Sequence, residues 1–168
     1  MTAATQEQRP VAEGVGERAD AIGPRRVFGW VAVAEAITWA LLLTGMFLKY
    51  VTETTEMGVR IGGALHGFVF LLFVVTTLVV ALDGRWGAGR TLLGLAAAVV
   101  PFATIPFERW AQRKGLLADA WRLRVQEGSN PAERLVGWAL RNPVLAAVLA
   151  VAAVAVVFTV LLIVGPPF

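Results

Sequence analysis

Two ionisable residues lie inside apolar stretches long enough to cross a bilayer, and they are the first candidates for chemistry. Glu35 stands within VAVAEAITW, and His66, the only histidine of the chain, stands within IGGALHGFV. A carboxylate in hydrocarbon is costly unless it is protonated or paired, and such residues mark proton or ligand sites. Thr38 continues the face of Glu35 one helical turn later, so this face is expected to look into a helix bundle. The alternative is an interhelical hydrogen bond that only fixes packing, and the sequence leaves both interpretations open.

The depths of the two residues argue against direct contact. If the helices begin near residues 27 and 59, Glu35 and His66 lie roughly 12 Å and 10 Å from opposite membrane faces. Their alpha carbons then differ by about 8 Å in height across a ~30 Å core. We therefore predict two half-sites, with Glu35 near Arg85 and Arg90. The other half-site combines a cation, an imidazole, hydroxyls and a carboxylate near water: Lys49, Tyr50, His66, Thr104 and Glu108.

Glycines around His66 predict close packing between helices. In GVRIGGALHG, Gly58 and Gly62, and then Gly63 and Gly67, are four residues apart. Small residues at this spacing let helix backbones approach closely in lipid. We expect this face to contact a neighbouring helix, a second copy of the chain or a larger membrane complex.

Several kinds of chemistry are disfavoured by the residue types. Cysteine is absent, which excludes disulfides, thiolate metal sites and cysteine nucleophiles. A lone histidine cannot supply a bis-histidine haem site or a zinc site within one chain. No nucleophile elbow, phosphate-binding loop, dinucleotide fingerprint or paired-carboxylate site is recognisable. We therefore expect no enzyme activity, metal or cofactor, and we expect the basic residues to contact phospholipid rather than nucleic acid.

The elements that would carry these residues are membrane helices. Hydrophobic residues make up 57% of the 168-residue chain and charged residues only 16%. Four apolar segments, 27–48, 59–82, 91–107 and 143–164, predict an all-α integral membrane bundle with four transmembrane helices. The first segment is too long for a signal-peptide core, so we expect it to span the membrane. The third is short and contains Pro101 and Pro106, so a kinked or re-entrant segment is the alternative.

The remaining segments are polar. Residues 1–24 lack apolar periodicity and are predicted to be a disordered tail, followed by a three-helix membrane core over 25–110. A connection over 108–142 follows, and its part over 111–142 is predicted to be basic and to lie at the membrane interface. Within it, the spacing of Leu117, Trp121 and Val125 predicts an amphipathic helix.

A second short helix is predicted near the end of this connection. Asn130 can cap it, Pro131 suits its first position, and Glu133 completes a capping-box-like pattern. Its apolar face would include Leu135 and Trp138. The segment 143–164 then follows as a fourth helix, which carries no charge and is interpreted as an anchor or packing helix.

Charge does not settle the orientation. With four spans the basic residues divide nearly evenly, and positive-inside counting mildly favours both termini outside. If 91–107 is re-entrant, all but two of the 15 Lys and Arg residues lie on one side, the exceptions being Lys49 and Arg60.

Three motifs resemble a known family. AEAITWALLLTGMFLKY, GGALHGFVFLLFVV and PFATIPFE are together similar to the small bacterial integral membrane proteins grouped as domain of unknown function 3817. The resemblance covers about residues 25–110 and implies a fold and a cytoplasmic-membrane location, but no known reaction. It departs at Phe47, Ala103, Ile105 and Pro106. The motif positions matched are Glu35, Lys49, Tyr50, His66, Gly67, Pro101, Phe102 and Thr104.

These observations favour one function and leave one alternative. We predict a non-enzymatic, multi-pass protein of the cytoplasmic membrane that packs against itself or a larger complex. The alternative is a small transporter-like or proton-linked protein that uses Glu35, Lys49 and His66.

Overall fold

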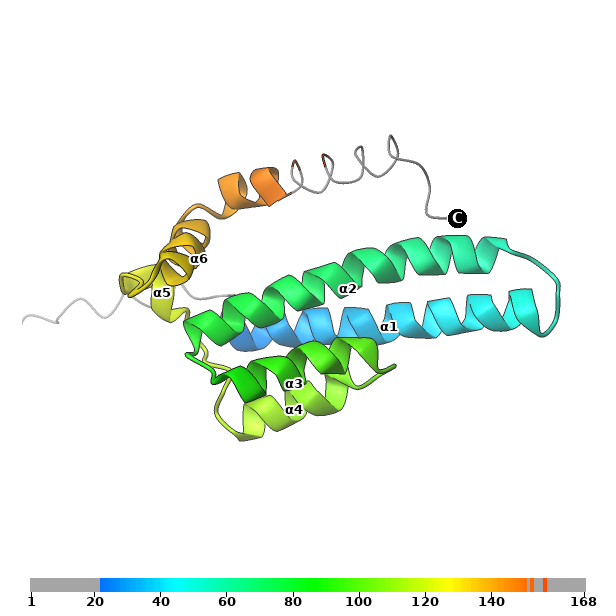
Figure 1. The fold of residues 1–168 in the computed structure, drawn as a ribbon, viewed down its shortest axis with the longest axis horizontal. Helices are drawn as coiled ribbons and strands as arrows, with labels where there is room; N and C mark the ends of the chain where they lie inside the picture. Colours follow the sequence, from blue (N-terminus) through cyan, green and yellow to red (C-terminus); the bar gives the residue numbers. More distant parts are fainter. Residues whose placement is uncertain (1–21, 151, 153–155, 157–168) are drawn as a thin grey trace, which may run out of the picture.

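The fold is a long helical hairpin with shorter helices along its side and at one end (Figure 1). The computed structural model describes residues 22–150, 152 and 156, and every regular element within them is α-helical. Helices α1 (Pro24–Tyr50) and α2 (Met57–Asp83) form the hairpin. Helices α3 (Ala88–Val99) and α4 (Thr104–Arg113) lie beside it, and α5 (Arg122–Val125) and α6 (Pro131–Arg141) lie at its end. The all-α prediction is confirmed.

The two long helices extend beyond the segments predicted for them. α1 begins at Pro24, where the fixed φ of proline suits the first helical position, and it continues past residue 48 to Tyr50. α2 runs from Met57 to Asp83 rather than over 59–82. Both helices are long and apolar enough to cross a membrane. Each has 27 residues, so each is about 40 Å long, which exceeds a ~30 Å hydrocarbon core.

The prediction of one helix over 91–107 is wrong. Val100, which precedes Pro101, has extended backbone angles (φ −94°, ψ 123°), as expected of a residue before proline. Phe102 then takes a positive φ of 63°, and the chain turns back into α4. Pro106 is tolerated because it stands in the first turn of α4, where its missing N–H needs no partner. The result is a short helical hairpin that packs on α1 and α2.

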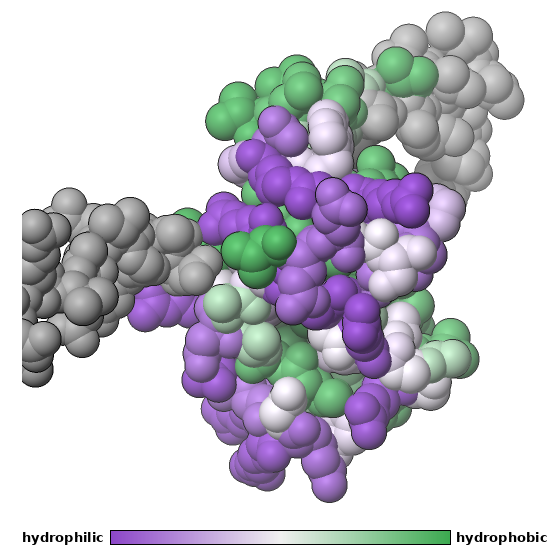
Figure 2. Space-filling view, turned by 90° about the vertical axis from the view of Figure 1, so that its left-hand side faces the viewer, coloured by the Kyte–Doolittle hydropathy of each residue, from purple (hydrophilic) through white to green (hydrophobic). Residues whose placement is uncertain are grey.

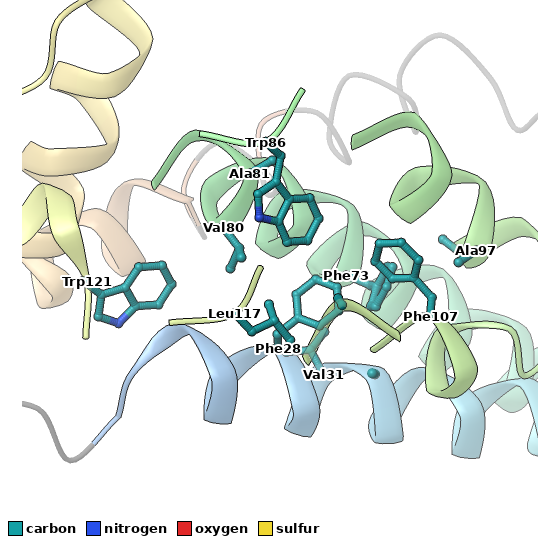
Figure 3. Packing of buried hydrophobic residues seen from close by; sticks show 13 residues of the cluster. Phe28, Val31, Phe73, Val80, Ala81, Trp86, Ala97, Phe107, Leu117 and Trp121 are labelled. Atoms are coloured by element: carbon teal, nitrogen blue, oxygen red, sulfur yellow. The ribbon is translucent and has the colours of Figure 1, made fainter. Parts of the chain in front are cut away.

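An aromatic core fills the end of the bundle where α1 begins. Phe28 of α1 lies 5.3 Å from Phe73, 6.1 Å from Trp86 and 6.0 Å from Phe107, measured between ring centroids (Figure 3). These tilted and edge-on arrangements are the ones aromatic rings prefer. Phe28 and Phe73 are fully buried, so this cluster joins α1, α2 and α4 into one unit.

The predicted helix through Leu117, Trp121 and Val125 is also wrong. Most of the chain between α4 and α5 is irregular, and Leu117 and Trp121 are buried in the core, whereas Val125 is 86% exposed. The indole of Trp121 donates a hydrogen bond to the Ile22 carbonyl (2.9 Å). Gly23 is required here, because a Cβ would lie 1.8 Å from the carbonyl oxygen of Asp119. Burial against the start of α1 therefore replaces helical periodicity in this connection.

The second short helix is found where it was predicted, as α6. The Asn130 side chain accepts a hydrogen bond from the Glu133 backbone N–H (2.8 Å), and Pro131 stands in the first turn. Leu135 and Trp138, the predicted apolar face, are exposed, and Val136 faces the core instead. The predicted tail lies outside the described residues up to residue 21. The predicted fourth span is described at residues 143–150, which are helical, and at residues 152 and 156.

Candidate functional site

The relative position of α1 and α2 is set by a close contact between glycine backbones. A Cβ on Gly45 would lie 2.4 Å from the carbonyl carbon of Gly58, and one on Gly62 would lie 3.0 Å from the Leu41 carbonyl oxygen. Only residues without a Cβ allow this approach. Along an antiparallel pair, these contacts bring His66 opposite Thr38.

Glu35, Thr38 and His66 form a buried polar cluster between the two long helices. The Thr38 hydroxyl lies 3.0 Å from the Glu35 carbonyl oxygen, 3.3 Å from Glu35 Oε2 and 3.4 Å from His66 Nδ1. His66 Nδ1 itself lies 3.6 Å from Glu35 Oε2. The hydroxyl has one proton for several acceptors, so these contacts form a coupled network rather than independent bonds.

The cluster is largely buried. Glu35 is 0% exposed, Thr38 is 7% exposed and the His66 side chain is 13% exposed. The imidazole lies against the Trp39 ring, with centroids 4.3 Å apart, and the Trp39 indole N–H donates to the Ala98 carbonyl of α3 (3.3 Å). One atom, Glu35 Oε1, is buried without a hydrogen-bond partner within the described part of the chain.

The prediction of two separate half-sites is therefore wrong. It counted depth from residues 27 and 59 as if both lay at membrane faces, whereas both helices are longer and their register follows the glycine contact. Arg85, expected near Glu35, instead contacts Ser129 (3.4 Å) and Glu133 (3.8 Å).

The other predicted site residues are distributed over two more places. Lys49 pairs with Glu56 (3.3 Å) near the α1–α2 loop and lies 5.3 Å from the ring centroid of the exposed Tyr50. The Thr104 hydroxyl donates to the Ala32 carbonyl of α1 (3.0 Å). Glu108, next to α1, accepts a hydrogen bond from Gln112.

The four predicted packing glycines divide into two pairs. Gly58 and Gly62 contact α1, as described above. Gly63 would bring a Cβ only to ordinary contact with Leu42 (3.8 Å), and nothing lies within 4 Å of a Cβ on Gly67. The first pair thus packs within the chain, and the second faces outward.

The sequence interpretation missed a buried ionic network at the other end of α2. Asp83 is 2% exposed and accepts hydrogen bonds from the backbone N–H groups of Arg122 (3.2 Å) and Leu123 (2.8 Å). The Arg122 guanidinium donates to the Asp83 and Leu82 carbonyls and to Glu133 (3.1 Å). The available signal was Asp83 itself, an acidic residue directly after a long apolar run.

Glu133 is the residue that ties α6 into this network. The Ser129 backbone N–H chiefly, together with Arg122 and the Ser129 hydroxyl, holds the pKa of Glu133 below its ordinary value, against the opposing effect of burial. The network therefore fastens the connection to the end of the hairpin. Among the described residues, no group of three His, Asp or Glu side chains is placed to hold a metal ion.

Comparison with known proteins identifies the family. The family described as Domain of unknown function (DUF3817) matches residues 25–113, which extend from the first residues of α1 to the end of α4. The chain belongs to this family. The DUF3817 region contains the polar cluster and the aromatic contacts of Phe28, whereas α5, α6 and residues 143–150 follow it. The resemblance stated from the motifs is confirmed.

A longer relative supports the membrane assignment. A Streptomyces coelicolor (strain ATCC BAA-471 / A3(2) / M145) protein named "Putative membrane protein SCO5905" is 51% identical over 112 residues. These residues are 64% of this chain and 13% of that relative, so the chain spans a small part of the relative's length. No solved structure matches this chain.

The surface of the hairpin agrees with this assignment. Large apolar side chains of α1 and α2 are exposed, among them Ile37 (56%), Phe47 (54%), Phe68 (62%) and Val75 (55%). Water would make such a surface unfavourable, whereas lipid would not. This DUF3817 chain is a membrane protein with two candidate transmembrane helices.

Proposed function

We propose that this DUF3817 chain is a non-enzymatic, multi-pass protein of the cytoplasmic membrane that works by packing against a second copy or a larger membrane complex. The observation that carries the proposal is the polar cluster between the long helices. Glu35, Thr38 and His66 contact one another between α1 and α2, with Glu35 and Thr38 buried and His66 partly buried, which favours a role in holding the hairpin together over one in lining a pathway.

The outward glycines supply the packing surface. Gly67 has open space where a side chain would be, and Gly63 has only an ordinary contact, so another helix backbone can approach α2 here. Gly58 and Gly62 are excluded from this role because α1 already covers them.

Gly67→Leu tests the proposal, since its side chain would enter open space and leave the α1–α2 contact intact. Val75→Leu, at another exposed position of α2, is the matched control. We expect Gly67→Leu to reduce chemical cross-linking in native membranes and to lower the assembled mass in mild detergent. Unchanged assembly in the variant would contradict the proposal.

The depth of the α3–α4 hairpin supports a re-entrant topology. The Ala98 carbonyl near the end of α3 bonds Trp39, and Thr104 at the start of α4 bonds Ala32. Ala32 is the ninth and Trp39 the sixteenth of the 27 residues of α1 (Pro24–Tyr50), so the turn between α3 and α4 reaches about half the length of the long helices.

Charge supports an orientation for this topology. The end of the bundle where α1, α2, α3 and α4 meet α5 and α6 carries all described basic residues except Lys49 and Arg60, and the face seen there is largely hydrophilic (Figure 2). Positive-inside bias then puts this end in the cytoplasm. The residues at this end are Arg25, Arg26, Arg85, Arg90, Arg109, Arg113, Lys114, Arg122, Arg124, Arg134 and Arg141.

Single-cysteine labelling tests topology and orientation in the cysteine-free chain. An impermeant thiol reagent added outside whole cells should label Met57→Cys but not Gly87→Cys or Glu127→Cys, three positions that are exposed in the structure. Phe102→Cys, at the turn, should stay protected from both sides if α3–α4 is re-entrant. Labelling of Phe102→Cys from outside would contradict the re-entrant topology.

The second candidate function is proton-linked activity at the same cluster. It is favoured by Glu35 Oε1, a buried carboxyl oxygen without a donor, where a proton or water would bind. Lys49 is no longer part of it, because it pairs with Glu56 near the loop. Glu35→Gln and His66→Gln should then change proton flux in vesicles, whereas Lys49→Gln should not. Equal flux in all three variants would contradict this second function.

A further inference from the structure

An apolar groove runs along the α3–α4 hairpin, outside the polar cluster. It has a volume of about 310 Å³ and is lined by Leu93, Ala96 and Val100 of α3, by Ala103 of the turn, and by Phe107 and Trp110 of α4. Leu93 and Val100 are each more than half exposed, so the groove opens to the surroundings of the protein. In a membrane protein those surroundings are lipid.

Cations stand at one end of this groove. Because α3 and α4 are antiparallel, Leu93 and Trp110 mark the end away from the turn, at the basic end of the bundle (Figure 1). Arg90 precedes Leu93 by three residues, and Arg113 and Lys114 follow Trp110 by three and four. These spacings put Arg90 and Arg113 on the groove side of α3 and α4, about one turn beyond the lining residues, and Lys114 directly follows the end of α4.

The three cations are available to a ligand. Arg90, Arg113 and Lys114 are exposed, and none of them forms an ion pair within residues 22–150. The nearest acidic residue on α4, Glu108, is buried beside α1 and accepts a hydrogen bond from Gln112. Long basic side chains keep their heads at the membrane surface while their stems lie against apolar groups.

We propose that the groove binds an anionic glycerophospholipid. One acyl chain lies between Leu93 and Trp110 and extends toward the turn, and Arg90, Arg113 and Lys114 hold the phosphate. Charge complementarity selects an anionic headgroup over a zwitterionic one, since a choline or ethanolamine group would bring a second positive charge to this cationic mouth. Positive-inside bias also places this end in the leaflet whose surface potential is negative. This inference needs the membrane location but not the proposed assembly.

Native mass spectrometry of the full chain in mild detergent tests the headgroup preference. Phosphatidylglycerol and phosphatidylcholine with the same acyl chains are added at equal concentration. We expect one phosphatidylglycerol to bind at least tenfold more tightly than phosphatidylcholine. The triple variant Arg90→Gln, Arg113→Gln, Lys114→Gln should remove this preference. The control Lys49→Gln, Arg60→Gln, at the opposite end, should retain it.

A second variant tests the groove itself. Ala96→Phe fills the groove from an exposed position. Leu92→Phe adds a ring at a position of α3 that is 64% exposed and does not line the groove. Only Ala96→Phe should lower phosphatidylglycerol binding, by tenfold or more, with helix content by circular dichroism unchanged in both variants.

Three results would overturn the proposal. Equal binding of the two lipids would remove the headgroup site. Unchanged phosphatidylglycerol binding in Ala96→Phe would place the lipid elsewhere. A change of oligomeric state in Ala96→Phe without a change in lipid binding would assign the groove to a second copy of the chain. If Ala96→Phe fails to fold, the unaltered chain is tested with brominated phosphatidylglycerol, which should quench the fluorescence of Trp110. The Trp110 fluorescence is the part of the signal that is lost in Trp110→Phe. Absence of this quenching also refutes the proposal.

Discussion

Replacing Gly45 with alanine is the sharpest test of the helix register that brings Glu35 and His66 together. A Cβ on Gly45 would lie 2.4 and 2.5 Å from the carbonyl carbon and oxygen of Gly58, and 2.7 Å from the Val59 nitrogen. Backbone atoms cannot rotate away as a flexible side chain can. Restoring ordinary contact at about 3.5 Å requires the two helices to separate by roughly 1 Å.

The magnitude follows from two opposing effects. Overpacking costs about 1–3 kcal/mol, and a clash with rigid backbone belongs at the upper end of this range. Alanine gains about 1 kcal/mol over glycine in helix propensity. The expected net loss for Gly45→Ala is therefore about 2 kcal/mol, which lowers the folded-to-unfolded ratio roughly thirtyfold.

Titration with sodium dodecyl sulfate in mixed micelles, followed by circular dichroism, measures this loss. Gly67→Ala is the matched control, because no atom lies within 4 Å of its new Cβ, and it should stabilise the chain by up to about 1 kcal/mol. Gly62→Ala, whose Cβ would meet the Leu41 carbonyl at 3.0 Å, should fall between the two. If Gly45→Ala proves as stable as Gly67→Ala, the close contact and the register that rests on it are refuted.

Three further predictions concern the short helices. Asp83→Asn removes the carboxylate charge that accepts hydrogen bonds from the backbone N–H groups at the start of α5, so the docking of α5 should weaken by about 2 kcal/mol. Trypsin should then cleave the chain between α4 and α6 faster, and unchanged cleavage would count against the network. Because the pKa of Glu133 is lower in the folded protein than in the unfolded chain, its carboxylate stabilises the fold above the unfolded pKa, and this stabilisation is lost as the pH falls through the folded pKa. Hydrogen exchange in α6 should therefore become faster as the pH falls through this range, after correction for the intrinsic exchange rate. Glu133→Gln should abolish this pH dependence. Thr104→Val should cost about 1 kcal/mol by removing the bond to α1, whereas Thr91→Val, which removes only a local bond to Gly87 in the first turn of α3, should cost little in the same detergent titration.

The long helices and one short helix were predictable because their signals are local. Continuous apolar sequence and a starting proline mark α1, and Asn130 with Pro131 marks the start of α6. The break between α3 and α4 was predictable only in part. Pro101 and Pro106 indicated a disturbance, but the positive φ of Phe102, which turns the chain back, depends on packing that no local pattern records.

The residues of the candidate site were predicted correctly, but their geometry was not. Glu35, Thr38 and His66 were all identified, but their separation was calculated from assumed membrane faces. The true register depends on Gly45, which lies in α1 outside the glycine pattern recognised in α2. Trp121 was assigned to an amphipathic helix for a related reason: its spacing with Leu117 is helical, yet both side chains are buried by contacts distant in sequence.

The turn between α3 and α4 and the polar cluster depend on each other. Ending α3 before Pro101 frees carbonyls that hydrocarbon cannot satisfy, and the Trp39 indole bonds one of them, at Ala98. The same indole ring lies against His66, so the side chain that satisfies the broken helix also covers the imidazole. A single residue of α1 thereby supports both features at the same depth. This explains why the turn between α3 and α4 and the Glu35–His66 pair occur together near the middle of α1.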